Sequence, residues 1–243
     1  GPPTPTFRRP SPGAASVDLV SPSPRAALTD ALAEVTHATA RFTLRVDGLT
    51  DPDLGAPSLL PGWTRAHVVG HVARNAEGMV NLVAWALTGR PTPMYPSMEA
   101  RNVGIEEAAH LPRHDLRVLL DSTSAALAVA VRRLADADDE LLERLVLFGA
   151  PPPGTTPDVP AWTLGFARLR EVEIHHLDLG AGLAPSDWPE SFVARMVPFL
   201  DARSPSPGLL GSTADVVAWR LGRGAGLDVR RPDGSDPGAP PDW

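Results

Sequence analysis

Four long segments, in which apolar residues recur every three or four positions, constrain the fold of this chain more than any other feature. Residues at this spacing lie on one face of an α-helix, so each segment is expected to form a helix with an apolar face to bury. Helices that are joined by loops and share one core pack as a four-helix bundle. The sequence therefore predicts a mainly α-helical fold with four long helices, over residues 22–48, 64–88, 114–135 and 160–179.

Breaks rich in proline and glycine separate these segments and set their ends. Residues 51–62 are expected to form a loop, after which Thr64 is the expected N-cap of the second long helix. Ser97 is expected to cap a short helix that ends at Ala109. The apolar segment 141–148 runs into a Pro-Pro-Pro-Gly sequence, which ends any regular structure there.

The chain divides into three expected parts. Residues 1–21 are rich in Pro, Ser and Gly, show no periodic pattern, and are expected to be a disordered leader. Residues 22–184 contain the predicted bundle, and residues 185–243 are expected to form a small C-terminal domain that is mostly helical. The elements predicted in that domain are two helices and one possible strand, over residues 189–200, 213–222 and 227–230.

The composition excludes several classes of function. The chain has 22 basic and 29 acidic residues, a net charge of −7 and no basic block, which argues against a nucleic-acid partner. No apolar run approaches the roughly 20 residues that a membrane span needs. We therefore expect a cytoplasmic protein, a monomer or small homo-oligomer, with a small-molecule partner. Because the chain has no cysteine, a metal would need His, Asp or Glu ligands, and thiol chemistry would need a thiol from outside.

The last long segment contains the pattern Glu171-x-x-x-His175. One helical turn separates these residues, so a carboxylate oxygen and an imidazole nitrogen can approach one point, as metal ligands do. The best candidate for a third ligand is His71, in the second long segment. Three protein ligands would leave one position open, which is typical of a catalytic zinc site rather than a structural one.

The same spacing has a simpler interpretation, a surface charge pair, and Glu106 and His110 repeat it elsewhere. A polar stripe on the last long segment favours a buried site. Burying Glu171 and His175 would bury the whole stripe, and buried polar groups need a partner such as a metal. The stripe is formed by four residues: Arg168, Glu171, His175 and Asp178.

A polar row also follows the second long helix, where His67, His71 and Asn75 are spaced four residues apart. His71 could equally be a core histidine that is hydrogen-bonded to Asn75, and His67 is the rival candidate for the third ligand. Arg223, between two glycines, is either a solvated residue or one whose backbone approaches a ligand closely.

Several stretches closely resemble the mycothiol-dependent maleylpyruvate isomerase family. The resemblance begins with Leu-Pro-Gly-Trp-Thr-Arg-Ala-His-Val-Val-Gly-His at 60–71 and continues through Asn75, Asn81 and Trp85 to Glu-Ala-Arg-Asn at 99–102. It returns at 170–181, in Gly-Arg-Gly at 222–224 and in the terminal Pro-Pro-x-Trp, and spans nearly all of residues 25–243. The chain departs from the family by a much shorter stretch between residues 200 and 212, and Arg74 and His176 occupy positions that vary among relatives.

The resemblance implies a DinB-like four-helix bundle that binds a divalent metal, usually zinc, through two His and one Glu, with a reduced C-terminal domain that carries an arginine needed for activity. By motif position the ligands are His71, Glu171 and His175, and the arginine is Arg223, which would bind the substrate carboxylate. Other residues of the matched segments are expected to contact substrate or thiol: Asn75, Asn81, Trp85 and Arg101.

The implied activity is cis-trans isomerisation of an unsaturated 2-oxo acid with mycothiol as cosubstrate. The thiolate adds to the double bond, the resulting single bond rotates, and the thiol is expelled. If the thiol is not expelled, the same site is a mycothiol S-transferase that conjugates an electrophile, which is the nearest alternative. A zinc-hydroxide hydrolase and a non-catalytic metal-stabilised binding module are further alternatives.

Overall fold

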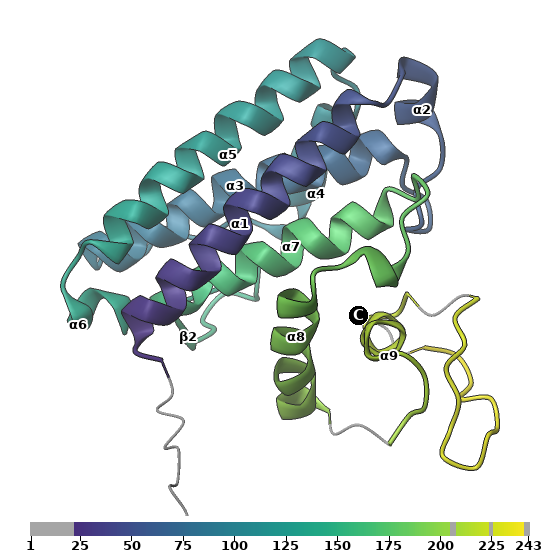
Figure 1. Ribbon diagram of the computed structural model, residues 1–243. Helices are drawn as coiled ribbons and strands as arrows, with labels where there is room; N and C mark the ends of the chain where they lie inside the picture. The colour runs from purple at the N-terminus through teal and green to yellow at the C-terminus, as the bar shows by residue number, and fades with distance from the viewer. Residues whose placement is uncertain (1–21, 205–207, 224–225, 241–243) are drawn as a thin grey trace, which may run out of the picture.

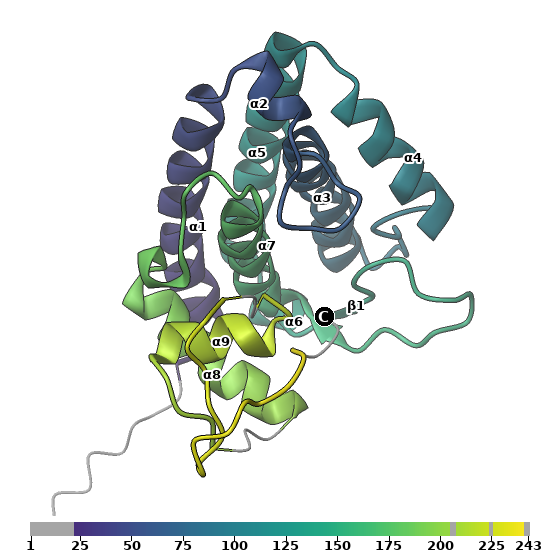
Figure 2. The same cartoon turned by 90° about the vertical axis from the view of Figure 1, so that its right-hand side faces the viewer.

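A computed structural model of the protein describes residues 22–204, 208–223 and 226–240, so the expected leader lies outside the described residues. Four long helices lie side by side as a bundle (Figures 1 and 2). In this bundle the first and second helices in the list below each contact both the third and the fourth, which closes the ring and confirms the predicted architecture. The four helices are α1 (Pro24–Asp47), α3 (Arg65–Thr88), α5 (Arg113–Ala135) and α7 (Leu164–Asp178).

Two helices, α3 and α4, begin at the predicted capping residues. The Thr64 side chain accepts a hydrogen bond from the backbone N–H of His67 and so caps α3, and Ser97 caps α4 (Met98–Ala109) in the same way. Gly89 ends α3 with a φ of 72°, a conformation that glycine adopts without steric cost.

One predicted loop contains a short helix. Residues 51–62 were expected to lack regular structure, but α2 (Asp51–Gly55) forms because Thr50 and Asp53 make a reciprocal capping box around its first turn. The helix α4 packs against α3 at a close approach, where a Cβ on Gly70 would lie 2.8 Å from the Cβ of Ala108.

The connection from α5 to α7 is partly ordered by a small sheet. The helix α6 (Asp139–Leu142) leads to β1 (Leu145–Val146), which pairs antiparallel with β2 (Val159–Pro160). The 3₁₀ turn η1 (Ala161–Thr163) then leads into α7. The sheet closes the Pro-rich loop between residues 146 and 159, which lies beside the bundle (Figure 2).

The C-terminal segment consists of the 3₁₀ turn η2 (Pro185–Asp187), α8 (Glu190–Arg203) and α9 (Thr213–Arg220). The strand expected at residues 227–230 is reduced to an isolated bridge between Leu210 and Arg230, so that prediction is wrong. This segment shares one core cluster with the bundle, to which it contributes Trp188, Phe192, Met196, Leu200, Val217 and Leu221. Within the described ranges, the structure contains no helix that is long and apolar enough to span a membrane.

Candidate functional site

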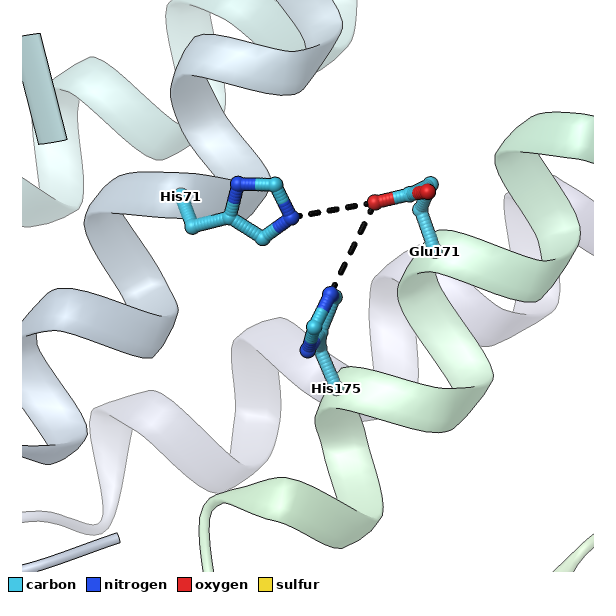
Figure 3. Close-up of side chains that lie close together, drawn as sticks. All are labelled: His71, Glu171 and His175. Atoms are coloured by element: carbon cyan, nitrogen blue, oxygen red, sulfur yellow. Dashed lines mark hydrogen bonds and ion pairs between the residues drawn. The ribbon is translucent and has the colours of Figure 1, made fainter. Parts of the chain in front are cut away.

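Three side chains from two helices converge on one point (Figure 3). His71 comes from α3, and Glu171 and His175 lie one turn apart on α7. The Oε2 atom of Glu171 is 3.0 Å from Nε2 of His71 and 3.6 Å from Nε2 of His175. All three potential ligand atoms lie within 4.8 Å of one another, so the structure brings together the three residues predicted as metal ligands.

This donor set fits a divalent metal ion. Ligands about 2.1 Å from a tetrahedral zinc are separated by about 3.4 Å, close to the two separations measured from Glu171. Burial and the neighbouring His175 lower the pKa of His71 to about 4, so its imidazole is neutral, as a ligand must be. Burial would raise the pKa of Glu171, but the hydrogen bonds with His175 and His71 outweigh it and hold that pKa well below the usual range. The carboxylate is therefore ionised.

The second nitrogen of His175 is held by a buried acid. Its Nδ1 lies 2.9 Å from Oδ2 of Asp178, whose side chain is fully buried. Arg223 donates to both oxygens of that carboxylate, from Nε at 3.0 Å and from Nη2 at 2.7 Å, and from Nη1 to the carbonyl of Leu221. Its side chain is only 11% exposed, so Arg223 lies behind His175 rather than in bulk solvent.

These bonds determine the charge state of Asp178. Burial alone would raise its pKa, but the hydrogen bonds with His175 and Arg223 outweigh that effect and lower it. A carboxylate that accepts from Nδ1 leaves Nε2 of the imidazole available to a metal. Carboxylates that contact a histidine ligand, but not the metal itself, commonly orient the ligand in this way. The contact with Asp178 was not predicted, although its position three residues after His175 was a signal.

Arg101 and Trp63 surround the other histidine. Nη2 of Arg101 lies 3.3 Å from Nδ1 of His71, and the Trp63 ring meets the imidazole edge-on with the centroids 5.6 Å apart. The structure therefore places Arg101, a predicted substrate- or thiol-binding residue, in contact with a candidate ligand.

In the polar stripe on α7, Arg168 and Asp178 are buried, whereas Glu171 and His175 are half-buried. Nη1 of Arg168 donates to Oδ1 of Asn75 and to the carbonyl of Val72, each at 2.8 Å, which links α7 to α3. Burial lowers the pKa of Arg168 to about 10, so the group remains a cation at neutral pH. Asn75 therefore supports the helix pair behind the ligands through Arg168.

The rival residues are engaged elsewhere. Nδ1 of His67 lies 2.7 Å from Oγ1 of Thr64, and its Nε2 lies 3.0 Å from Oε2 of Glu106, so this histidine belongs to the start of α3. His110 and Glu106 form the exposed pair that the simpler interpretation describes. Neither histidine joins the cluster of potential ligands found in the described residues.

Two of the predicted substrate- or thiol-binding residues lie far along α3. Asn81 and Trp85 follow His71 by a helical rise of about 15 and 21 Å, respectively. Asn81 donates to the carbonyl of Pro93, and Trp85 packs in a core cluster near that end of α3. Neither side chain contacts the three candidate ligands, and their role in binding stays a prediction.

Sequence reasoning missed a pair of arginines beside the site. Arg170, which precedes Glu171, lies with its Cζ 4.1 Å from the ring centroid of Phe199, and Arg203 lies 4.8 Å from the same centroid. Burial lowers the pKa of Arg170 to about 10, which leaves it charged at neutral pH. The four-residue spacing of Phe199 and Arg203 on α8 was the available signal.

Comparison with known proteins gives consistent matches. Residues 35–180 match the family model described as the mycothiol maleylpyruvate isomerase N-terminal domain. The crystal structure of the mycothiol-dependent maleylpyruvate isomerase is 30% identical, with a TM-score of 0.76 over 89% of this chain and 97% of that one, and its histidine-to-alanine mutant matches equally. A protein of Geobacillus kaustophilus named as a metal-dependent hydrolase is 28% identical over 119 residues, which make up 49% of this chain and 63% of that relative.

Proposed function

This chain belongs to the mycothiol maleylpyruvate isomerase family, and from that membership we propose that it is a metal- and mycothiol-dependent cis-trans isomerase of an unsaturated 2-oxo acid. The observation that carries the proposal is the convergence of His71, Glu171 and His175 in a chain without cysteine. Because the protein has no thiol of its own, thiol chemistry at this site needs a thiol from solution, for which we propose mycothiol.

In this proposal His71, Glu171 and His175 hold the metal, which we propose to be zinc, and leave one coordination position open. When bound, the ion supplies a positive charge that lowers the pKa of a coordinated thiol and keeps it as the nucleophilic thiolate. Asp178 accepts a hydrogen bond from Nδ1–H of His175 and so fixes the ring, while Arg223 keeps the carboxylate in place.

The proposed reaction needs no reactant besides the thiol and the unsaturated 2-oxo acid. The thiolate sulfur forms a bond to one alkene carbon of a cis-enoic 2-oxo acid, and the electron pair of the double bond moves to the conjugated carbonyl as an enolate. The former double bond rotates as a single bond. The enolate then re-forms the double bond as its trans isomer, the carbon–sulfur bond breaks, and the thiolate is regenerated.

Arg101 changes its role in this proposal when the metal binds. A neutral His71 that binds a metal through Nε2 carries its proton on Nδ1, which then no longer accepts from Arg101. Nη2 of Arg101 then becomes available to an anionic substrate, while Nη1 still donates to Oδ1 of Asn102 at 3.1 Å. Direct binding of the substrate by Arg223, which was expected from the resemblance, stays a prediction because its guanidinium is engaged by Asp178.

The test is incubation of the metal-loaded protein with mycothiol and maleylpyruvate. Products are followed by mass and by the ultraviolet spectrum. A trans product of unchanged mass that forms only with thiol supports the isomerase. Accumulation of the thiol adduct identifies an S-transferase instead, and hydrolysis without thiol would point to the activity named for the Geobacillus relative. Absence of thiol-dependent turnover refutes the proposed function.

A further inference from the structure

A cavity of about 590 Å³ opens beside the three candidate ligands. It lies between α7, the end of α8 and the residues that lead into β2, and Glu171 forms part of its wall. The cavity therefore borders a residue of the proposed metal centre, and its volume falls in the range of small-molecule sites.

Two arginines line this cavity from different helices. Arg170 extends from α7 and Arg203 from α8, and both lie against the ring of Phe199. Contact with an aromatic ring holds a guanidinium in place and leaves its N–H groups available for an anion. Within residues 22–204 neither arginine makes an ion pair, although Asp158 also lines the cavity.

Arg170 has an unused hydrogen-bond donor. Its Nε is buried and has no partner among the described residues. A buried donor without an acceptor costs free energy, so such groups in proteins usually have a partner that is ordered water or a ligand. A carboxylate is the natural acceptor, since its two oxygens match the spacing of the guanidinium N–H groups.

Arg223, which the family resemblance implies as the residue that binds the substrate carboxylate, is less available for that role. Both oxygens of Asp178 accept from Arg223, whose third nitrogen donates to the carbonyl of Leu221. Each edge of this guanidinium therefore includes a donor that is already used inside the protein. A substrate acid group that lies in this cavity therefore needs a cation other than Arg223.

We propose that Arg170 and Arg203 form the subsite for a carboxylate of the electrophilic substrate, in the cavity that Glu171 shares. This proposal rests on the proposed function and gives the substrate an orientation. The reacting double bond lies toward the metal centre, and an acid group lies between the two arginines on the Phe199 side. The subsite selects anionic electrophiles over neutral ones.

The experiment compares Arg170→Gln and Arg203→Gln with the wild type, on the acid substrate and on its neutral methyl ester. We expect KM for the acid to rise on the order of 10–100-fold in Arg170→Gln, with KM for the ester unchanged. Arg203 is exposed, so its substitution should leave the fold intact and cause a smaller rise in the same direction. The matched control is Arg133→Gln, which removes an exposed arginine from α5 that does not line the cavity.

An unchanged KM for the acid in both variants would overturn the subsite, as would equal losses with acid and ester. Succinate separates this failure from failure of the proposed function, because its binding to the metal-loaded protein can be measured by calorimetry without turnover. Succinate binding that weakens in Arg170→Gln and Arg203→Gln supports the subsite even if the wild type turns over no electrophile. Binding that is absent in the wild type, or equal in all variants, refutes it.

Discussion

Replacement of Asp178 by alanine tests the arrangement behind the candidate ligands most directly. The substitution removes the acceptor for His175 Nδ1 and for two donors of Arg223, and leaves a largely buried guanidinium without its counter-charge. Breaking a buried ion pair by removing one partner costs about 3–5 kcal/mol. We therefore expect the free energy of unfolding of the metal-free protein to fall by about that amount.

The same substitution should weaken metal binding. Without Asp178, nothing in the observed contacts fixes the proton of His175 on Nδ1, so the ring loses its preferred tautomer and orientation. Loss of a carboxylate that is hydrogen-bonded to a metal ligand typically reduces metal affinity about 10–100-fold. The affinity is measured by competition with a chromophoric chelator, and the stability by urea denaturation.

Asp139→Ala is the matched control for Asp178→Ala. Asp139 accepts from Arg25 at 2.6 Å, and the side chains are 86% and 41% exposed, respectively. An exposed pair of this kind is worth about 0–1 kcal/mol, so the control should change stability little and metal affinity not at all. If Asp178→Ala matches the control in both assays, then the buried carboxylate neither stabilises Arg223 nor orients His175, and the reasoning fails.

Three further predictions concern other groups near α7. His71→Ala, Glu171→Ala and His175→Ala should each lose metal and activity but keep the helical circular dichroism spectrum, and full activity in metal-free Glu171→Ala would contradict the site. Asn75→Ala removes an acceptor from buried Arg168, so stability should fall by about 1–3 kcal/mol while metal is retained, as urea denaturation and metal analysis will show. Burial and nearby arginines lower the pKa of His176 from 6.5 to about 4, so between those pH values the unfolded chain binds more protons than the folded one. Stability should therefore fall by about 3 kcal/mol from pH 7 to pH 4 through this group, and His176→Gln should reduce that slope in urea titrations.

The bundle could be predicted because helical periodicity and local capping agree with the final fold. The apolar spacing and Thr64 predicted α3 within a residue at each end. The short helix α2 was missed because a five-residue helix has no measurable period, and only the reciprocal contact between Thr50 and Asp53 reveals it. The strand predicted at 227–230 failed because a short apolar stretch cannot specify a partner, and here only one bridge forms.

The candidate ligands were partly predictable for the same reason. Spacing on a helix determines which residues share a face, so Glu171 and His175 could be paired from local sequence. Spacing could not choose between His67 and His71, because both lie on the same polar row. The choice depends on Thr64 and Glu106, which engage His67, and on the packing of α3 against α7, which brings His71 to Glu171. Those contacts are set by tertiary structure.

The C-terminal segment is short but reaches the site at two places, one near the end of α8 and one just after α9. Arg223, after α9, donates to the carboxylate of Asp178 behind His175. At the end of α8, Phe199 and Arg203 line the cavity beside Glu171. These contacts need only two helix ends placed against α7. The shared hydrophobic core fixes that placement, since the buried faces of α8 and α9 belong to the same cluster as the bundle. A segment of this size can therefore take the proposed roles in substrate binding and ligand orientation, because both depend on where its helices end.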